Sequence, residues 1–171
     1  TDEYFFGGSS GDLLQARQNQ IPILRKDFMI DEYQVLEAKS MGADVILLIA
    51  SCLTPSRVKE LAAVAKNLGM EILLEIHQED ELEHICDDVD LVGVNNRNLR
   101  NFEVDIETSV RLSEKIPANK IRISESGISE IAAIQRLKEF GYKGFLMGEY
   151  FMKQPDPSVA FARFIQQLKT D

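Results

Sequence analysis

The chain has 171 residues, 44% of them hydrophobic, which suits an ordinary globular protein with a sizeable core. Its 19 Lys and Arg against 28 Asp and Glu leave a net charge of −9, which argues against nucleic-acid-binding and anionic-membrane surfaces, since both need a basic patch. No apolar run approaches the ~20 residues of a transmembrane helix, and no signal peptide is recognised. Cys52 and Cys86 lack metal-ligand spacing, and two free thiols indicate a cytoplasmic protein without a metal site.

Six short apolar segments predict β-strands. They are rich in Ile, Leu and Val and mostly lack alternation, which is typical of parallel strands covered on both faces. In chain order the predicted strands are Ile21–Leu24, Asp44–Ala50, Glu71–Ile76, Leu91–Val94, Ile121–Ser124 and Gly144–Met147.

Amphipathic segments between these strands predict helices. Gly42, Gly69 and Gly141 follow three of them, where a helix C-terminal glycine belongs, and Pro55 suits a first helical turn. The predicted helices are Asp31–Met41, Pro55–Leu68, Asp105–Ile116, Glu130–Phe140 and Pro157–Leu168.

The repeated alternation of strand and helix predicts an α/β protein with a parallel sheet, in a single domain over residues 1–171. An open doubly wound sheet would carry a Gly-rich phosphate fingerprint after its first strand, and no G-x-G-x-x-G occurs in the chain. Polar residues instead recur at the strand ends, as at the active-site rim of a (βα)8 TIM barrel. The sequence therefore predicts part of such a barrel, with six of its eight units.

Two ionisable side chains at strand ends are candidates for acid–base chemistry. Lys26 follows the first predicted strand between Arg25 and Asp27, and a lysine there suits a general acid as well as it suits a salt-bridged surface residue. Glu75 ends the run "ILLE", and a carboxylate at this depth must be paired or protonated. The alternative for Glu75 is a structural ion pair with Lys26 or Arg97.

The later strand ends predict a site for an anion. "VNNRNL" supplies amide donors and the guanidinium of Arg97, although Asn also favours turns regardless of function. Ser126–Gly127 and Gly148 follow the last two strands, and bare backbone N–H groups at such glycines form a phosphate cradle. Each glycine alone is explained by a turn; the pair on consecutive strands favours phosphate.

Five segments together, "LRKDF", "LLEIH", "GVNNRNL", "SESGI" and "LMGEYFM", resemble indole-3-glycerol phosphate synthase of tryptophan biosynthesis in order and spacing. The resemblance covers essentially all 171 residues. It implies a (βα)8 barrel lyase that closes the pyrrole ring of 1-(2-carboxyphenylamino)-1-deoxyribulose 5-phosphate, with loss of carbon dioxide and water. It implies no cofactor, and as partner only this small phosphorylated, anthranilate-derived substrate.

The resemblance also implies a role for individual residues. Lys26 would protonate the carbonyl oxygen during ring closure, and Glu75 would be its partner in the proton transfers. Asn95 would orient groups around the anthranilate portion, with Ser126 as a further catalytic residue. The implied binding residues are Phe6, Phe28, Arg97 and Glu125 for the substrate, and Gly127, Gly148 and Glu149 for its phosphate, mainly through backbone N–H groups.

The sequence departs from the family in one respect. The resemblance aligns Thr1 with a point after the family's second strand, so the amino-terminal helix, the first strand and nearly all of the second are expected to be missing. A polypeptide that began at Thr1 is therefore expected to self-associate or to be only loosely packed, because its edge strands lose their neighbours. It is also expected to lack synthase activity, because the family carries a further catalytic lysine and a glutamate on that first strand. The alternatives are another phosphate-binding barrel enzyme, such as phosphoribosylanthranilate isomerase or the α subunit of tryptophan synthase, and a catalytically silent fragment that binds phosphate.

Overall fold

A computed structural model describes residues 1–4, 7–98 and 101–170. They form two compact units: the first comprises Thr1–Ile76 with Asp80–Val92, and the second His77–Glu79 with Gly93–Asp171. The single domain over residues 1–171 stays a prediction.

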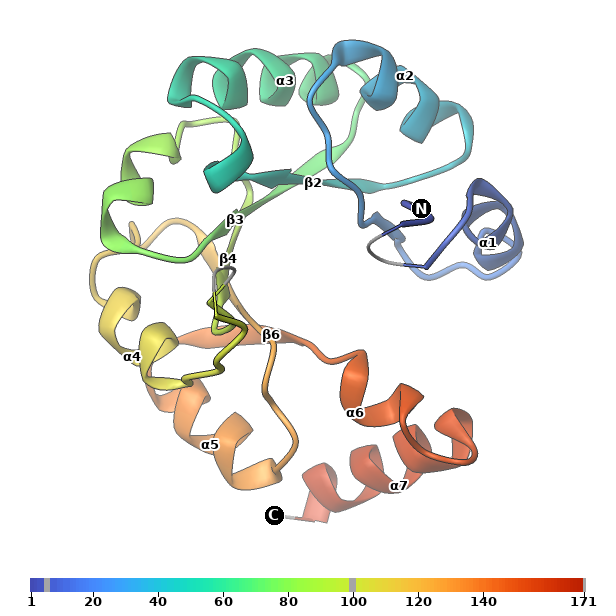
Figure 1. Ribbon diagram of the computed structural model, residues 1–171, viewed down its shortest axis with the longest axis vertical. Coiled ribbons are helices and arrows are strands. Elements are labelled where there is room, and N and C mark those ends of the chain that lie inside the picture. Colours follow the sequence, from blue (N-terminus) through green and yellow to red (C-terminus); the bar gives the residue numbers. More distant parts are fainter. Residues whose placement is uncertain (5–6, 99–100, 171) are drawn as a thin grey trace. The chain divides into compact units, whose positions relative to one another are not determined.

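Helices and strands alternate along the first unit (Figure 1). In chain order they are α1 (Ser10–Ala16), β1 (Leu24–Arg25), α2 (Glu32–Ser40), β2 (Val45–Ile49), the 3₁₀ helix η1 (Ala50–Cys52), α3 (Pro55–Asn67), β3 (Glu71–Ile76), the 3₁₀ helix η2 (Glu79–His84) and the start of β4 (Leu91–Asn95). Helices α2 and α3 pack against each other on the same side of β2 and β3. The helices therefore cover one face of these strands.

The second unit continues the same alternation after the end of β4. Its elements are α4 (Glu107–Ser113), β5 (Ile121–Glu125), α5 (Ile131–Glu139), β6 (Tyr142–Leu146), α6 (Glu149–Met152) and α7 (Pro157–Thr170). Edge-to-face aromatic contacts join α6 to α7, with the Phe151 and Phe164 centroids 5.6 Å apart. Among the helices described, none has the length and apolar character needed to cross a membrane.

The sheet topology distinguishes the two architectures that fit the sequence. The pairs β1–β2, β2–β3 and β5–β6 are parallel, and the six strands neighbour one another in chain order. A doubly wound sheet reverses its strand order at a switch point, whereas barrel strands follow one another in sequence. The barrel fold predicted from the strand ends is therefore confirmed.

Four of the six predicted strands match the structure to within one residue at each end. β3 has the predicted bounds, because its apolar run is continuous and ends at a turn. The first prediction, Ile21–Leu24, is wrong in its placement. The Ile21 N–H donates to the Asn19 side chain and the Ile23 N–H to the Asp44 side chain, while Pro22 has no N–H. The pairing of β1 with β2 therefore begins only at Leu24.

β6 begins two residues before the prediction of Gly144–Met147. Tyr142, which the predicted run excluded, is 1% exposed and donates its hydroxyl to Ser109 O at 2.7 Å. Burial raises the pKa of Tyr142 to about 12, so this hydroxyl remains a donor. The exposed Lys143 interrupts the apolar pattern, which is why the sequence placed the start of the strand too late.

Local signals in the sequence account for both ends of α2 and α3 and for the end of α5. Asp31 caps α2 and Thr54 caps α3, each by accepting a backbone N–H from the first turn. Gly42, Gly69 and Gly141 have positive φ angles of 87°, 69° and 84°, which confirms the predicted C-terminal glycines.

Helices α1, α4, α6 and α7 differ from the prediction; α6 was not predicted, and α7 runs two residues beyond its predicted end at Leu168. α4 is shorter than Asp105–Ile116, because the Asp105 carboxylate accepts the Glu107 N–H in a turn and Pro117 disfavours helical backbone at Ile116. α1 was not predicted. Its only buried side chain is Leu13, so it has no apolar periodicity, and a capping box between Ser9 and Asp12 was the one local signal.

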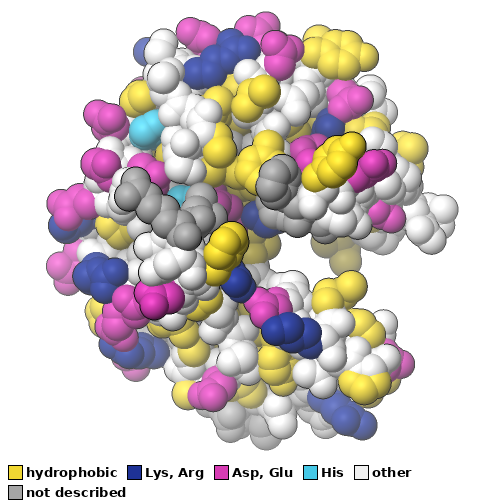
Figure 2. Space-filling view, in the orientation of Figure 1, with side chains coloured by type: hydrophobic (Ala, Val, Ile, Leu, Met, Phe, Trp, Pro, Cys, Tyr) yellow, Lys and Arg dark blue, Asp and Glu magenta, His cyan; other side chains and the backbone are white. Residues whose placement is uncertain are grey.

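The core of the first unit lies between β2, β3 and α3. Each fully buried aliphatic side chain there contributes about 1.5–3 kcal/mol relative to exposure. On the two faces of β2 and β3 and on α3, the Val, Leu and Ile side chains with no exposed surface are Ile46, Leu47, Leu48, Val58, Leu61, Ile72, Leu74 and Ile76. On the face shown in Figure 2, Lys and Arg side chains are interspersed with Asp and Glu among the described residues.

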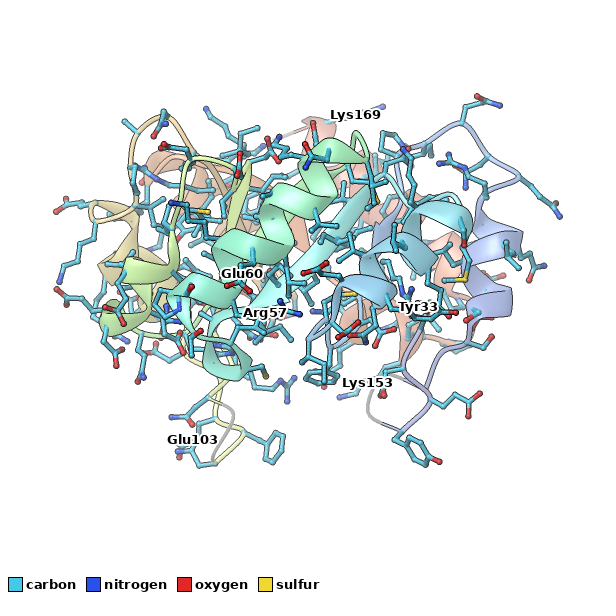
Figure 3. All side chains as sticks on the ribbon, turned by 90° about the horizontal axis from the view of Figure 1, so that it is seen from above. Tyr33, Arg57, Glu60, Glu103, Lys153 and Lys169 are labelled. Atoms are coloured by element: carbon cyan, nitrogen blue, oxygen red, sulfur yellow. The ribbon has the colours of Figure 1, made fainter. Side chains whose placement is uncertain are left out.

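Arg57 fastens the start of α3 to the segment before α2. Its guanidinium donates to Ile30 O through Nε at 3.3 Å and Nη2 at 3.2 Å. It also donates to Glu60 at 2.9 Å, and the two side chains lie next to each other on α3 (Figure 3). Because this ion pair is exposed, it contributes little to stability by itself. It orients Arg57 toward the Ile30 carbonyl.

Candidate active site

In the first unit the structure brings Lys26 and Glu75 together. Lys26 directly follows β1, Glu75 lies in β3, and Lys26 Nζ is 3.2 Å from Glu75 Oε2. The Glu75 side chain is 4% exposed and that of Lys26 is 38% exposed. A buried carboxylate thus faces an ammonium group that solvent or a substrate can reach, which is an arrangement suited to proton transfer.

The neighbours of Lys26 have a different function. Arg25 and Asp27 are buried, and Arg25 Nη2 lies 3.0 Å from Asp27 Oδ2 and 2.7 Å from Glu37 Oε2 in α2. Side chains alternate along an extended chain, so Arg25 and Asp27 point to the same side and Lys26 to the other. Of the three ionisable residues in "RKD", Arg25 binds α2, Asp27 holds the Arg25 guanidinium, and Lys26 meets Glu75.

We expect Asp27→Asn to lower the free energy of unfolding by about 2 kcal/mol near neutral pH, because Arg25 would lose a charged acceptor. Burial raises the pKa of Asp27, but hydrogen bonds from Thr1, Arg25 and the Phe28 N–H together outweigh it and hold the pKa below its ordinary value. A lowered folded-state pKa adds stability above the unfolded value of about 3.9, and that stability is lost as the pH falls through the folded value.

Urea unfolding of the unmodified protein and of Asp27→Asn, at neutral pH and below pH ~4, tests this expectation. The difference between their free energies of unfolding should become smaller in acid. Glu83→Gln, at an exposed position of the same unit, is the matched control. A difference that stays constant across the acid range would contradict a role for the Asp27 charge.

In the second unit, β4 ends in residues that form a turn and an ion-pair cluster. Asn95 Oδ1 accepts the Arg97 N–H at 2.9 Å, as Asn does in turns. Arg97 Nη2 lies 2.5 Å from Glu149 Oε2, and Lys153 Nζ lies 2.5 Å from Glu149 Oε1. The hydrogen bond from Lys153, with the charges of Lys153 and Arg97, holds the pKa of Glu149 below its ordinary value. Glu149 therefore carries a negative charge that orients Arg97.

β5 ends in a buried carboxylate followed by two residues of unusual backbone. Glu125 is 2% exposed, and Ser126 and Gly127 have φ angles of 67° and 71°. A left-handed conformation costs a non-glycine residue about 1–2 kcal/mol, and such strain gathers at functional sites. A Cβ on Gly127 would lie 2.0 Å from Val104 Cγ1, so both the backbone and the close approach require glycine here.

Gly148 differs from Gly127. Its φ of −98° is open to any residue, and an added Cβ would have no described heavy atom within 4 Å. Among the described residues, neither the backbone conformation nor a close neighbour requires glycine at position 148.

Two predicted aromatic residues, Phe28 and Phe6, and a possible metal site have still to be placed. Phe28 is half-buried beside Asp27, and Phe6 lies outside the described residues. Within the described part of the chain, no three His, Cys, Asp or Glu side chains gather as a metal site would require. The roles assigned to Lys26, Glu75 and the other site residues stay predictions.

The prediction of site residues left out Asn96, which is 3% exposed and bonded to both Ser124 and Ser126. The available signal was the second amide in "VNNRNL". Its partners lie 28 and 30 residues away in the chain, so only the fold reveals its connections.

Solved structures share this fold. The chain superposes on 3-hexulose-6-phosphate synthase from Salmonella typhimurium with a TM-score of 0.78 at 12% identity, covering 94% of this chain and 80% of the other. KGPDC from Streptococcus mutans gives a TM-score of 0.73 at 15% identity, with 94% of this chain and 79% of the other covered. At these identities the likeness concerns the fold alone.

Sequence relatives are much closer. Indole-3-glycerol phosphate synthase of Bacteroides thetaiotaomicron is 48% identical over 170 residues, which are 99% of this chain and 65% of the relative. The enzyme of the same name from Polaromonas sp. strain JS666 is 49% identical over 165 residues, 95% of this chain and 62% of the relative. The chain thus spans a little under two thirds of the length of these relatives.

The sequence profile described as indole-3-glycerol phosphate synthase matches residues 1–164, nearly the whole chain. The segments that carry the strand-end residues, from "LRKDF" to "LMGEYFM", all lie within this match. This chain belongs to the indole-3-glycerol phosphate synthase family.

Proposed function

We propose that the protein carrying these residues is a carbon–carbon lyase that makes indole-3-glycerol phosphate from 1-(2-carboxyphenylamino)-1-deoxyribulose 5-phosphate, as a step of tryptophan biosynthesis. The observation that carries the proposal is the pairing of Lys26 with the buried Glu75 at 3.2 Å, in a chain of this family. We also propose that the two compact units belong to one barrel domain, since β4 runs from one into the other.

The reaction requires protonation of the ketone oxygen of the substrate. The same oxygen later leaves as water. The ring carbon that bears the carboxylate attacks the ketone carbon, and Lys26 gives a proton to the ketone oxygen, which becomes a hydroxyl group. The bond to the carboxylate then breaks, carbon dioxide leaves, and its electron pair restores the aromatic ring. The hydroxyl takes up a second proton and leaves as water while the neighbouring carbon loses a proton, which forms the double bond that completes the pyrrole in the ring closed by the first step. Glu75, beside the Lys26 ammonium, takes part in these proton transfers.

The other site residues bind and orient the substrate in this proposal. Asn95 and Arg97 face the anthranilate portion, with Arg97 near its carboxylate. Glu125 and Ser126 support the reacting centre from the end of β5. Stacking on the aromatic ring falls to Phe28 and Phe6, and the phosphate is held by backbone N–H groups of Gly127, Gly148 and Glu149.

Turnover by the full-length protein tests the proposal. Indole fluorescence should appear with the carboxyphenylamino substrate, with one carbon dioxide released per product. Phosphoribosylanthranilate and indole-3-glycerol phosphate, offered as substrates of the alternative barrel enzymes, should be left unchanged. Phosphate binding without turnover of any of the three would instead support a silent binding protein.

Gly148→Val is expected to raise KM at least ~10-fold with little change in kcat, because lost ground-state binding appears in KM. The fold leaves room for the new side chain, so the variant should remain folded. Steady-state kinetics with the full-length protein measure the effect, and unfolding by urea checks the fold. The exposed Ala132→Val on α5 is the matched control for adding a β-branched side chain to this unit. An unchanged KM in Gly148→Val would contradict a phosphate at this strand end.

A further inference from the structure

A buried polar network joins β4, α4 and β5 around Asn96. Asn96 Nδ2 donates to Ser124 Oγ at 3.0 Å and to Ser126 O at 3.1 Å. Asn96 Oδ1 accepts from the Ser109 hydroxyl at 2.8 Å and from its N–H at 3.2 Å, and the two serine hydroxyls lie 2.8 Å apart. Every hydrogen-bonding position of the Asn96 amide is therefore used, so its orientation is fixed by its surroundings.

The backbone of Asn96 is fixed as well. Its N–H donates to Glu125 O at 2.9 Å, and its carbonyl accepts the Asp105 N–H at 2.9 Å. Asn96 thus contacts β5 through main chain and side chain, at Glu125 and at Ser126. Because Asn96 binds both Glu125 and Ser126, it fixes the path of the backbone at the end of β5.

Ser126 is the position that needs such support. Its φ of 67° is a conformation that non-glycine residues adopt only where the surrounding structure imposes it. Among the described contacts, the side-chain donor to the Ser126 carbonyl is Asn96 Nδ2. Because the Ser126 carbonyl and the Gly127 N–H belong to one peptide plane, fixing the carbonyl also fixes the direction of that N–H.

We propose that Asn96 is a positioning residue, whose buried amide holds the left-handed Ser126–Gly127 turn and aims the Gly127 N–H at an anionic group of the substrate. Asn96 itself makes no contact with substrate in this account. The kinetic consequence rests on the proposed function, in which Gly127 holds the phosphate. The support that Asn96 gives to the Ser126–Gly127 turn does not depend on the proposed function.

Kinetics of the full-length protein test the positioning role. Asn96→Ala should raise KM about 10-fold and change kcat by less than about 3-fold, because the turn contributes binding to ground and transition state alike. Asn96→Asp keeps an acceptor for Ser109 but has no donor for Ser126, so it should raise KM similarly. Ser109→Ala, the matched control, removes network bonds but none to Ser126, and should lower stability while leaving KM unchanged. A rise in KM for Ser109→Ala equal to that for Asn96→Ala would overturn the proposal.

The Ser126→Gly background supplies a test that needs no turnover. Glycine adopts a positive φ without support, so Asn96→Ala should lower the urea midpoint much less in this background than in the Ser126 protein. Where turnover is measured, the rise in KM should shrink below about 3-fold in the same background. If Asn96→Ala alone does not fold, recovery of folded protein in the double variant supports the proposal, and failure to recover it contradicts it. Equal losses of midpoint in both backgrounds would overturn it, whereas absence of turnover in the unmodified protein would overturn only the proposed synthase activity.

Discussion

Replacing Lys26 with Met in the full-length protein is expected to lower kcat at least ~100-fold, the usual scale for a lost general acid. In the proposed reaction Lys26, whose Nζ lies 3.2 Å from Glu75 Oε2, protonates the ketone oxygen, and methionine has no proton to donate. Methionine keeps the length and the apolar stem of lysine, so the variant should retain the fold. Steady-state kinetics measure the loss, with urea unfolding to verify the folded state.

Lys59→Met is the matched control for this experiment. Lys59 is exposed on α3, and the same substitution there removes one charge without touching the strand ends. Its kcat and KM should equal those of the unmodified protein. Turnover of Lys26→Met within a few-fold of normal would refute the assignment of Lys26 as the general acid.

Replacing Glu75 with Gln should likewise lower kcat about 100-fold, because glutamine cannot accept a proton at the pH of the assay. Glu75 is 3% exposed and lies within the buried β3, so the amide keeps the shape of the side chain and removes only its charge. Glu71→Gln, at the exposed start of the same strand, is the matched control and should leave kcat unchanged.

The double variant tests whether the two residues act as a unit. If Lys26 and Glu75 share one proton-transfer pathway, Lys26→Met with Glu75→Gln should cost about as much as the worse single variant. Independent roles would instead multiply the two losses, to about 10⁴-fold. A multiplied loss would contradict a shared pathway while leaving each single assignment in place.

Much of the architecture could be predicted from local patterns. The run Glu71–Ile76 was predicted with the bounds that β3 has, because a strand buried on both faces needs a continuous apolar segment. Asp31 and Thr54 cap the starts of α2 and α3, and glycines follow α2, α3 and α5, so local signals set these ends because capping depends on neighbouring residues. Where a strand end depended on partners far along the chain, as at Ile23 and Asp44, the prediction was wrong.

For the candidate site, the residue types at the strand ends determined the chemistry that could be predicted: an acid, a carboxylate, amides and bare glycines. Only the tertiary structure separated Lys26, which meets Glu75, from Arg25, which connects β1 to α2, and from Asp27, which holds the Arg25 guanidinium. Only it distinguished Gly127, required by a left-handed backbone against Val104, from Gly148, whose surroundings have room for a side chain. The physical reason is that strand and helix preferences depend on residues a few positions apart, whereas the charge partner of a side chain and the space around it also depend on more distant segments. The separation is 12 residues for Arg25 and Glu37 and 49 residues for Lys26 and Glu75, and only folding brings such segments close.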